Sequence, residues 1–261
     1  MGKKGHGKTA GKGKVLAKDV NITISTSKLS RQKRNELNQI VDKLLKVSSN
    51  FQTVPNAAKE WERHLEIRKL LEQVDQVEQG MKVTPEAESA RAARLEQLLQ
   101  WMVAQGADVG GVRPAQFAGC GWGLQAQRDL APGELVVAVP RRLMLTSEQV
   151  QHSVLGSLLV KDAMLQHMPH VALALLLLVE KFSPESFWEP YIRALPTTYS
   201  TVLYFTTQEL QELKGSPSFE PALKHCRNIA RQYAYFSKLF QNTSDPASEL
   251  LRDVFTYDEY R

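Results

Sequence analysis

The chain has 261 residues, 43% of them hydrophobic, and a formal net charge of +5 at neutral pH. This length allows one large domain or two of ordinary size, with enough apolar residues for a core. Two cysteines, Cys120 and Cys226, are too few for a disulfide framework or a cysteine-bound metal, so we expect neither, and no apolar run is long enough to span a bilayer.

The positive charge lies at the N-terminus, because residues 1–34 contain ten Lys or Arg and one acid, Asp19, while the rest is net acidic. A lysine- and glycine-rich segment has little apolar surface to bury, so we expect residues 1–29 to form a disordered tail. This distribution argues against a folded nucleic-acid surface and leaves nuclear import or weak polyanion contact to the tail. No apolar stretch follows the basic start, so we expect no secretory signal and a cytoplasmic protein, with the nucleus as the alternative.

Three helices are expected between residues 30 and 106, because apolar side chains recur there at helical spacing. Thr84-Pro85-Glu86 is a favourable start for the third helix, and Gly106 is a favourable stop. We interpret the stripes as core-facing, since no heptad persists long enough for a coiled coil. They consist of Leu37, Ile40, Val41, Leu44 and Leu45, then Ile67, Leu70, Leu71, Val74 and Val77, then Leu95, Leu98, Leu99 and Met102.

Residues 107–146 are expected to form strands. Gly119, Gly121 and Gly123 alternate with side chains at the start of a short strand, and a backbone without Cβ atoms lets another molecule approach closely. A Pro-Gly turn at residues 132–133 follows, and the β-prone residues 136–139 predict a second apolar strand.

From residue 147 onward the pattern predicts helices again. Residues 171–181 are apolar on nearly every side, which predicts a buried helix ending near Ser183. Residues 187–196 combine aromatic side chains with prolines, and we interpret them as a packed corner in preference to an aromatic ligand site. Residues 226–240 predict a last long helix that contributes several aromatic side chains to the core.

Four short motifs occur in order: Gly121-Trp122-Gly123, Arg128-Asp129-Leu130, Val139-Pro140-Arg141 and Ser186-Phe187-Trp188-Glu189-Pro190-Tyr191. Together they resemble SET-domain methyltransferases of the Rubisco-methyltransferase type, in which a helical insert divides the SET domain. Within that type, the segments at residues 59–62, 153–156, 230–236 and 255–257 resemble the actin-specific histidine N-methyltransferases. The likeness covers most of the chain from residue 59 onward.

The resemblance implies an α+β fold with three parts. Residues 30–106 would be an N-terminal helical region, residues 107–146 the first β part of a split SET domain, and residues 147–261 a helical insert. Because residues 257–261 are similar to a segment inside that insert, we expect the insert to be incomplete and the C-terminal SET half to be absent.

The resemblance also implies an activity, the transfer of a methyl group from S-adenosylmethionine (SAM) to a histidine ring nitrogen of actin. Separately from the resemblance, we expect a monomer. Such an enzyme needs alignment and the right tautomer more than strong acid–base catalysis. Two alternatives stay open. One is a lysine substrate, because the residues that discriminate between histidine and lysine would lie elsewhere. The other is a non-catalytic chain that binds actin or another protein.

Three adjacent residues match the cofactor segment of the family, which is an acid followed by glycine and an aromatic residue. They are Cys120, Gly121 and Trp122 in this chain. Cys120 departs from the family because it has no carboxylate, so a family contact made through the main chain would tolerate the change. We otherwise interpret Cys120 as a small packing residue in preference to a reactive thiol.

Arg91 is the fourth expected cofactor residue, because the family has an arginine ten residues before the tryptophan that corresponds to Trp101. The flanking Ala90 and Ala92 do not match, and a solvated helix arginine is the alternative. Nothing in the chain matches the family's Asn-His motif or its catalytic tyrosine. We therefore expect the catalytic residues downstream of Arg261, and little or no turnover by residues 1–261 alone.

Overall fold

The structure is a computed structural model that describes residues 28–50, 57–83 and 87–261. The tail expected at residues 1–29 falls almost entirely outside these ranges. So do the segment expected between the first two helices, at residues 52–56, and the helix start expected at Thr84-Pro85-Glu86. The domain boundaries drawn from the sequence stay a prediction.

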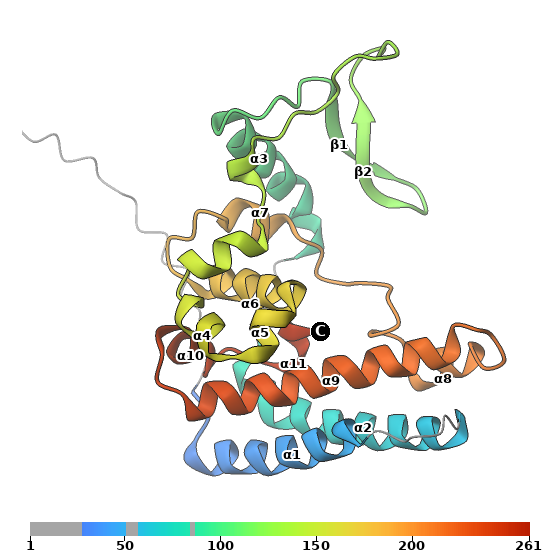
Figure 1. Cartoon of the computed structure of the whole chain (residues 1–261). Coiled ribbons are helices and arrows are strands. Elements are labelled where there is room, and N and C mark those ends of the chain that lie inside the picture. Colours follow the sequence, from blue (N-terminus) through green and yellow to red (C-terminus); the bar gives the residue numbers. More distant parts are fainter. Residues whose placement is uncertain (1–27, 51–56, 84–86) are drawn as a thin grey trace, which may run out of the picture.

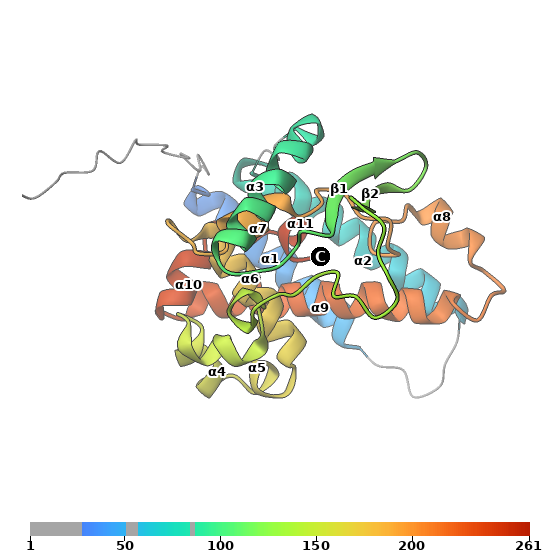
Figure 2. The ribbon, with the colours of Figure 1, turned by 90° about the horizontal axis from the view of Figure 1, so that it is seen from above.

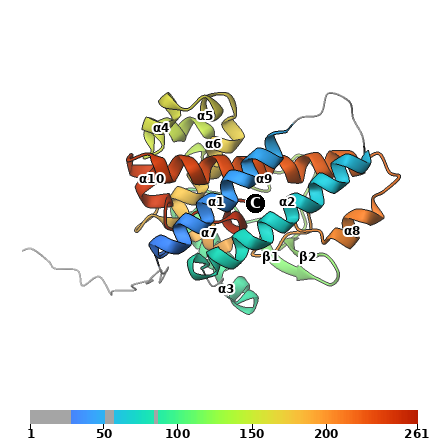
Figure 3. The same cartoon turned by 90° about the horizontal axis from the view of Figure 1, so that it is seen from below.

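Three long helices lie side by side at the bottom of the molecule in the view of Figure 1: α1 (Arg31–Ser49), α2 (Ala57–Glu78) and α9 (Phe219–Asn242). Figure 3 shows the same layer from below. α1 begins after Ser30, whose hydroxyl accepts a 3.3 Å hydrogen bond from the backbone N–H of Lys33. The apolar stripes expected in α1 and α2 face α9 and are largely buried, as Val41, Leu44 and Val74 illustrate.

The apolar helix α6 (Pro169–Phe182) completes the main core above this layer. It ends at Ser183, as expected, and its side chains Leu175 and Leu176 are almost fully buried. From α9, Tyr233, Phe236 and Phe240 enter the same core. The shorter helices are α4 (Gly156–Lys161), α5 (Ala163–His167), α8 (Thr207–Glu212), α10 (Pro246–Leu251) and α11 (Tyr257–Tyr260). The 3-10 turns are Gln79–Met81, Glu88–Ala90, Arg141–Leu143 and Ser147–His152.

The aromatic segment at residues 187–196 is a packed corner, as the sequence predicted. α3 (Arg91–Ala104) packs against α7 (Glu189–Ala194). Between them, the ring of Trp101 meets the rings of Phe187 and Trp188 at centroid separations of 5.2 and 6.0 Å. The edge-to-face arrangement of these rings favours packing. The corner fixes α3 to α7.

The sheet consists of two strands, β1 (Val112–Phe117) and β2 (Gly121–Ala126), within the described part of the chain. They form an antiparallel hairpin whose register runs from the Val112–Ala126 pair to the Phe117–Gly121 pair. β1 contacts α3, and the hairpin extends from the same end of the molecule as that helix (Figures 1 and 2).

The prediction of a second apolar strand at residues 136–139 is wrong. Only Ala138 is paired there, through two hydrogen bonds of 2.8 and 2.9 Å that it exchanges with Asp108. The side chain of Leu135 is 65% exposed, and those of Val136 and Val137 are 36% exposed. A β-prone run becomes a strand only where a partner supplies a hydrogen-bonded ladder, and one bridge is too short a ladder.

None of the helices in residues 28–50, 57–83 and 87–261 combines the length and the apolar character that a bilayer crossing requires.

Candidate functional site

The glycine segment singled out in the sequence forms the turn of the hairpin. The backbone N–H of Cys120 donates a 3.1 Å hydrogen bond to the carbonyl of Phe117, which closes the turn. Gly121 then starts β2 with a φ of +77°, in the left-handed region that glycine adopts without a steric penalty. A Cβ atom added to Gly121 would meet nothing within 4 Å. The main chain at Gly121 is therefore open to another molecule.

Gly123 has a different role from Gly121. Its backbone is ordinary for a strand, but an added Cβ atom would lie 3.2 Å from the ring of Phe117. The absence of a side chain at Gly123 lets that ring pack across the hairpin. Of the alternating glycines, Gly121 leaves space for a ligand, whereas Gly123 leaves space for the protein itself.

Cys120 and Trp122 flank the open glycine. Cys120 is exposed at the turn, and Trp122 is half-buried opposite Gln116 on β1. The exposure of Cys120 contradicts its interpretation as a packing residue, because a turn position has too few neighbours to bury a side chain. The structure thus places Cys120, Gly121 and Trp122 together on one accessible edge. Their contact with a cofactor stays a prediction.

Arg91 is the first residue of α3, and its side chain is 16% exposed. One of its terminal nitrogens lies 3.0 Å from a carboxylate oxygen of Glu88, while its Nε is buried without a hydrogen-bond partner. The partial burial of Tyr199, which is still 44% exposed, raises its pKa, and the neighbouring Tyr191 adds to the rise, whereas the positive charge of Arg91 opposes it. A buried N–H donor without an acceptor is unusual and suits an anionic group of a ligand.

Arg91 lies at the start of α3, the helix that contacts the hairpin, but the structure does not join the two. α3 and β1 are in contact, but no hydrogen bond, ion pair or ring contact links Arg91 to Cys120, Gly121 or Trp122 in the described part of the chain. A ligand that touches both would have to extend from the start of α3 to the turn of the hairpin.

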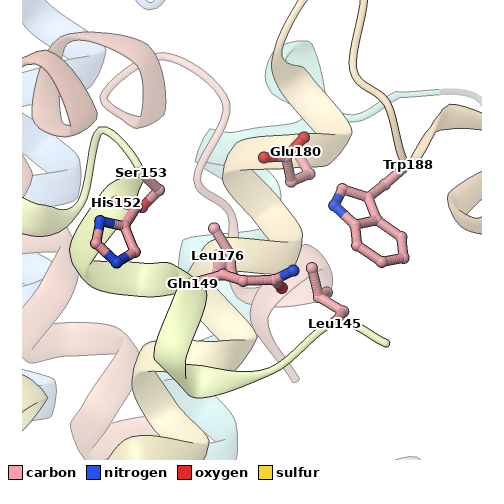
Figure 4. A pocket seen from close by; sticks show the side chains of 7 residues that line it. All are labelled: Leu145, Gln149, His152, Ser153, Leu176, Glu180 and Trp188. Atoms are coloured by element: carbon pink, nitrogen blue, oxygen red, sulfur yellow. The ribbon is translucent and has the colours of Figure 1, made fainter. Parts of the chain in front are cut away.

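A separate pocket lies between α6, the 3-10 turn Ser147–His152 and the aromatic corner (Figure 4). Its volume is about 220 Å³. The pocket was not predictable from the sequence, because its walls come from three segments that are far apart in the chain. The only signal would have been Glu180, an acid near the end of an otherwise apolar helix. The lining residues are Leu145, Gln149, His152, Ser153, Leu176, Glu180 and Trp188.

Among the residues that the structure describes, no cluster of three or more His, Cys, Asp or Glu side chains is arranged to hold a metal ion.

The fold is that of part of a SET domain. A crystal structure of the SET domain of LSMT bound to methyl-lysine and AdoHcy matches 64% of this chain with a TM-score of 0.54 and 24% sequence identity. A structure of Rubisco LSMT bound to AdoMet matches the same share of the chain with a TM-score of 0.53. These matches cover 37% and 38% of the solved chains. At this level of identity the likeness establishes the fold, which is α+β as the sequence predicted.

The chain is similar over its length to actin-histidine N-methyltransferases, which confirms the resemblance drawn from the motifs. It is 38% identical to the dog protein of that name over 262 residues, which is 100% of this chain, and 40% identical to the human protein over 227 residues. The chain spans about two fifths of the length of these relatives, 42% and 37% respectively. No protein-family profile matches the chain.

Proposed function

We propose that this chain is part of a SAM-dependent protein-histidine N-methyltransferase that acts on actin. The identity of 38–40% to proteins named actin-histidine N-methyltransferase, over 87–100% of the chain, carries this proposal. The SET-domain fold supports it, because the solved SET structures that share this fold hold AdoMet or AdoHcy.

The residues of the chain fit SAM at two points. The main chain at Gly121 is open, so its polar groups would contact the cofactor without hindrance from a side chain. The buried Nε–H of Arg91 lacks an acceptor and would bind the cofactor's carboxylate. Cys120 cannot provide the acid of the family, and at that position the contact would be made by the main chain.

When bound, SAM would supply an activated methyl group: a neutral imidazole nitrogen of the substrate would attack the methyl carbon in line, S-adenosylhomocysteine would leave with the electrons of the broken S–C bond, and the other ring nitrogen would release its proton to solvent. The protein then has to align the two groups and hold the imidazole in the tautomer that leaves the attacking nitrogen unprotonated. No residue of this chain matches the family's Asn-His motif or its catalytic tyrosine. We therefore assign cofactor contacts to Arg91 and the hairpin, and no proton transfer to any residue of this chain.

The test is a chimera in which this chain replaces the matching 227-residue stretch of the human relative. With SAM and unmethylated actin, the chimera should produce actin methylated on histidine, detected by mass spectrometry. The chain alone, shown to be folded by circular dichroism, should produce little or none. Methylation by the chain alone would contradict our assignment of residues, whereas a folded but inactive chimera would contradict the function.

A non-catalytic actin-binding role is the second candidate. Two observations favour it. The helical core around α1, α2, α6 and α9 is well packed, so these helices form a folded unit. The hairpin region exposes Leu124 by 62% and Leu135 by 65%, so apolar side chains are accessible to a partner. A large contiguous apolar patch marks an interaction surface, and this alternative requires Leu124 and Leu135 to belong to one. Under this alternative the chain would co-sediment with filamentous actin at micromolar concentration. Absence of the chain from the pellet would exclude it.

A lysine substrate is the remaining alternative, and the methyl-lysine and lysine bound in two of the solved SET structures favour it. The same mass spectra distinguish the two, because the methyl group is assigned to a histidine or to a lysine. We also propose that the protein is monomeric and cytoplasmic. Size-exclusion chromatography with light scattering and imaging of the tagged chain test these two statements.

A further inference from the structure

The pocket beside α6 contains a carboxylate without a counter-charge. Glu180 accepts a 2.5 Å hydrogen bond from the hydroxyl of Ser186, and that hydroxyl in turn accepts a 3.1 Å bond from the backbone N–H of Trp188. In the described ranges, no lysine, arginine or histidine forms a salt bridge with Glu180. A half-buried carboxylate with one hydroxyl donor retains most of its capacity to accept hydrogen bonds.

The other walls of the pocket combine aromatic and aliphatic surfaces. Trp188 is 7% exposed, and its indole lies beside the Glu180 carboxylate (Figure 4). Leu145 and Leu176 line the pocket with aliphatic carbon, and the amide of Gln149 lies between these two side chains (Figure 4). The carbonyl oxygen of this amide already accepts a 3.0 Å hydrogen bond from the backbone N–H of Thr146, which fixes its orientation.

The size of the pocket limits its occupant. Sites for drug-sized ligands and cofactors enclose about 300–1,000 Å³, whereas this pocket has a volume of about 220 Å³. It therefore suits one side chain of a partner better than a whole cofactor. The pocket is also distinct from the residues to which we assign SAM, because neither Arg91 nor Gly121 lines it.

We propose that this pocket binds an arginine side chain presented by a protein partner. A guanidinium is cationic, has only donors, and matches a carboxylate with two parallel hydrogen bonds, which Glu180 is free to accept. Its flat face stacks on an aromatic ring such as that of Trp188, and its aliphatic stem packs against Leu145 and Leu176. The proposal is independent of methyl transfer.

The first experiment observes the four tryptophan indole resonances of the ¹⁵N-labelled chain by NMR, with the Trp188 peak assigned from its loss in Trp188→Phe. Titration with ethylguanidinium should shift the Trp188 peak saturably and leave the Trp61 and Trp122 peaks unchanged, while the Trp101 peak, whose ring packs against Trp188, shifts less. Ethylurea is the neutral isostere and ethylammonium the compact cation, and both should bind more weakly. No shift with ethylguanidinium, or equal shifts with ethylurea, would overturn the proposal. Equal affinity for ethylammonium would overturn the choice of a guanidinium.

Two charge-matched variants test the carboxylate. Glu180→Gln retains an oxygen that accepts from Ser186 but removes the charge, so it should weaken ethylguanidinium binding about tenfold or more. Glu185→Gln is the control, because Glu185 is exposed in the same segment and does not line the pocket. Equal losses in the two variants would show that long-range charge causes the effect and would contradict a site at Glu180.

The partner is tested with peptides. A short peptide with one central arginine, flanked by alanine and serine, should shift the Trp188 peak with at least the affinity of ethylguanidinium. The same peptide with citrulline in place of arginine should not. If ethylguanidinium binds and the arginine peptide does not, a side chain presented by a protein cannot reach the pocket, and that part of the proposal is wrong.

Discussion

The hydroxyl of Tyr233 donates a 2.5 Å hydrogen bond to the carboxylate of Glu78, and both side chains are buried, at 0% and 1% exposure. Glu78 is the last residue of α2, and Tyr233 lies within α9. The second oxygen of Glu78 accepts a 2.9 Å bond from the backbone N–H of Tyr257 at the start of α11. One acid thus joins three helices, and its protonation state affects all three.

The first prediction is a loss of stability with rising pH that depends on Glu78. Burial raises the pKa of Glu78 from 4.5 to about 8, with Asp75 adding to the rise, while the hydrogen bonds from Tyr233 and Tyr257 and the charge of Lys82 oppose it. Between these two pH values the folded state holds a proton that the unfolded state has released. The contribution of Glu78 is therefore full below pH 4.5 and is lost as the pH rises through 8.

Urea unfolding at several pH values measures this loss, with Glu78→Gln as the reference.

His64 changes the pH dependence of stability in the opposite direction, because burial lowers its pKa from 6.5 to about 4, with the charge of Arg68 adding to the shift. Its contribution is present above pH 6.5 and is lost as the pH falls towards 4. Between pH 6.5 and 8, the wild type should lose up to about 1.4 kcal/mol per pH unit relative to Glu78→Gln. Parallel pH profiles would contradict the raised pKa.

The second prediction concerns the hydroxyl of Tyr233. Tyr233→Phe retains the ring, which stacks on Phe255 at 5.6 Å, and removes only the donor to Glu78. The variant should lose about 1 kcal/mol at pH 6, and more at pH 9, where an ionised carboxylate is left with one donor fewer. Tyr199→Phe is the matched control, because Tyr199 is exposed, and it should change little. Equal effects in the two variants would show that the bond contributes nothing.

The third prediction separates the two glycines of the hairpin. Gly121→Ala places a side chain on a backbone with a φ of +77° and should cost about 1–2 kcal/mol of local stability. Gly121→Ala should also weaken the binding of S-adenosylhomocysteine to the chimera. Calorimetry measures this affinity at a temperature at which both the variant and the wild type are fully folded. Gly123→Ala should disturb the ring of Phe117 and leave cofactor affinity closer to that of the wild type. Equal affinities for the two variants would argue against Gly121 as a cofactor contact.

The fourth prediction concerns Arg91. Arg91→Ala in the chimera should weaken S-adenosylhomocysteine binding about tenfold or more, because a charge-assisted hydrogen bond to the cofactor's carboxylate is lost. Arg113→Ala is the control, because Arg113 is an exposed arginine on β1 that bonds Gln125. Unchanged affinity in Arg91→Ala would leave Arg91 as a structural partner of Glu88.

The helices α1 and α2 were predictable from local spacing alone, whereas the stripe expected in α3 is only half-buried. Side chains such as Leu37, Val41 and Leu44 recur on one helical face, and that face is buried. The failure at residues 136–139 has a physical reason. The β-branched composition there reports a preference for extended backbone, but a strand also needs a neighbour, which local sequence does not specify.

The candidate site was predictable only where it is continuous in sequence. The turn at Cys120 and Gly121 was predictable because the glycines that form it lie close together in the sequence. The pocket at Glu180 and Trp188 was not, because separate segments of the chain form its walls. The bond from Tyr233 to Glu78 joins residues that are 155 positions apart. Such contacts depend on how the helices pack together, and the periodicity within one helix carries no information about them.

The most direct measurement is the mass-spectrometric assignment of the methyl group on actin after incubation with SAM and the chimera that carries this chain. We predict a methyl group on a histidine, and a strong reduction of that product in Gly121→Ala and Arg91→Ala. Methylation of lysine instead, or unmethylated actin from a folded chimera that binds S-adenosylhomocysteine, would contradict this prediction.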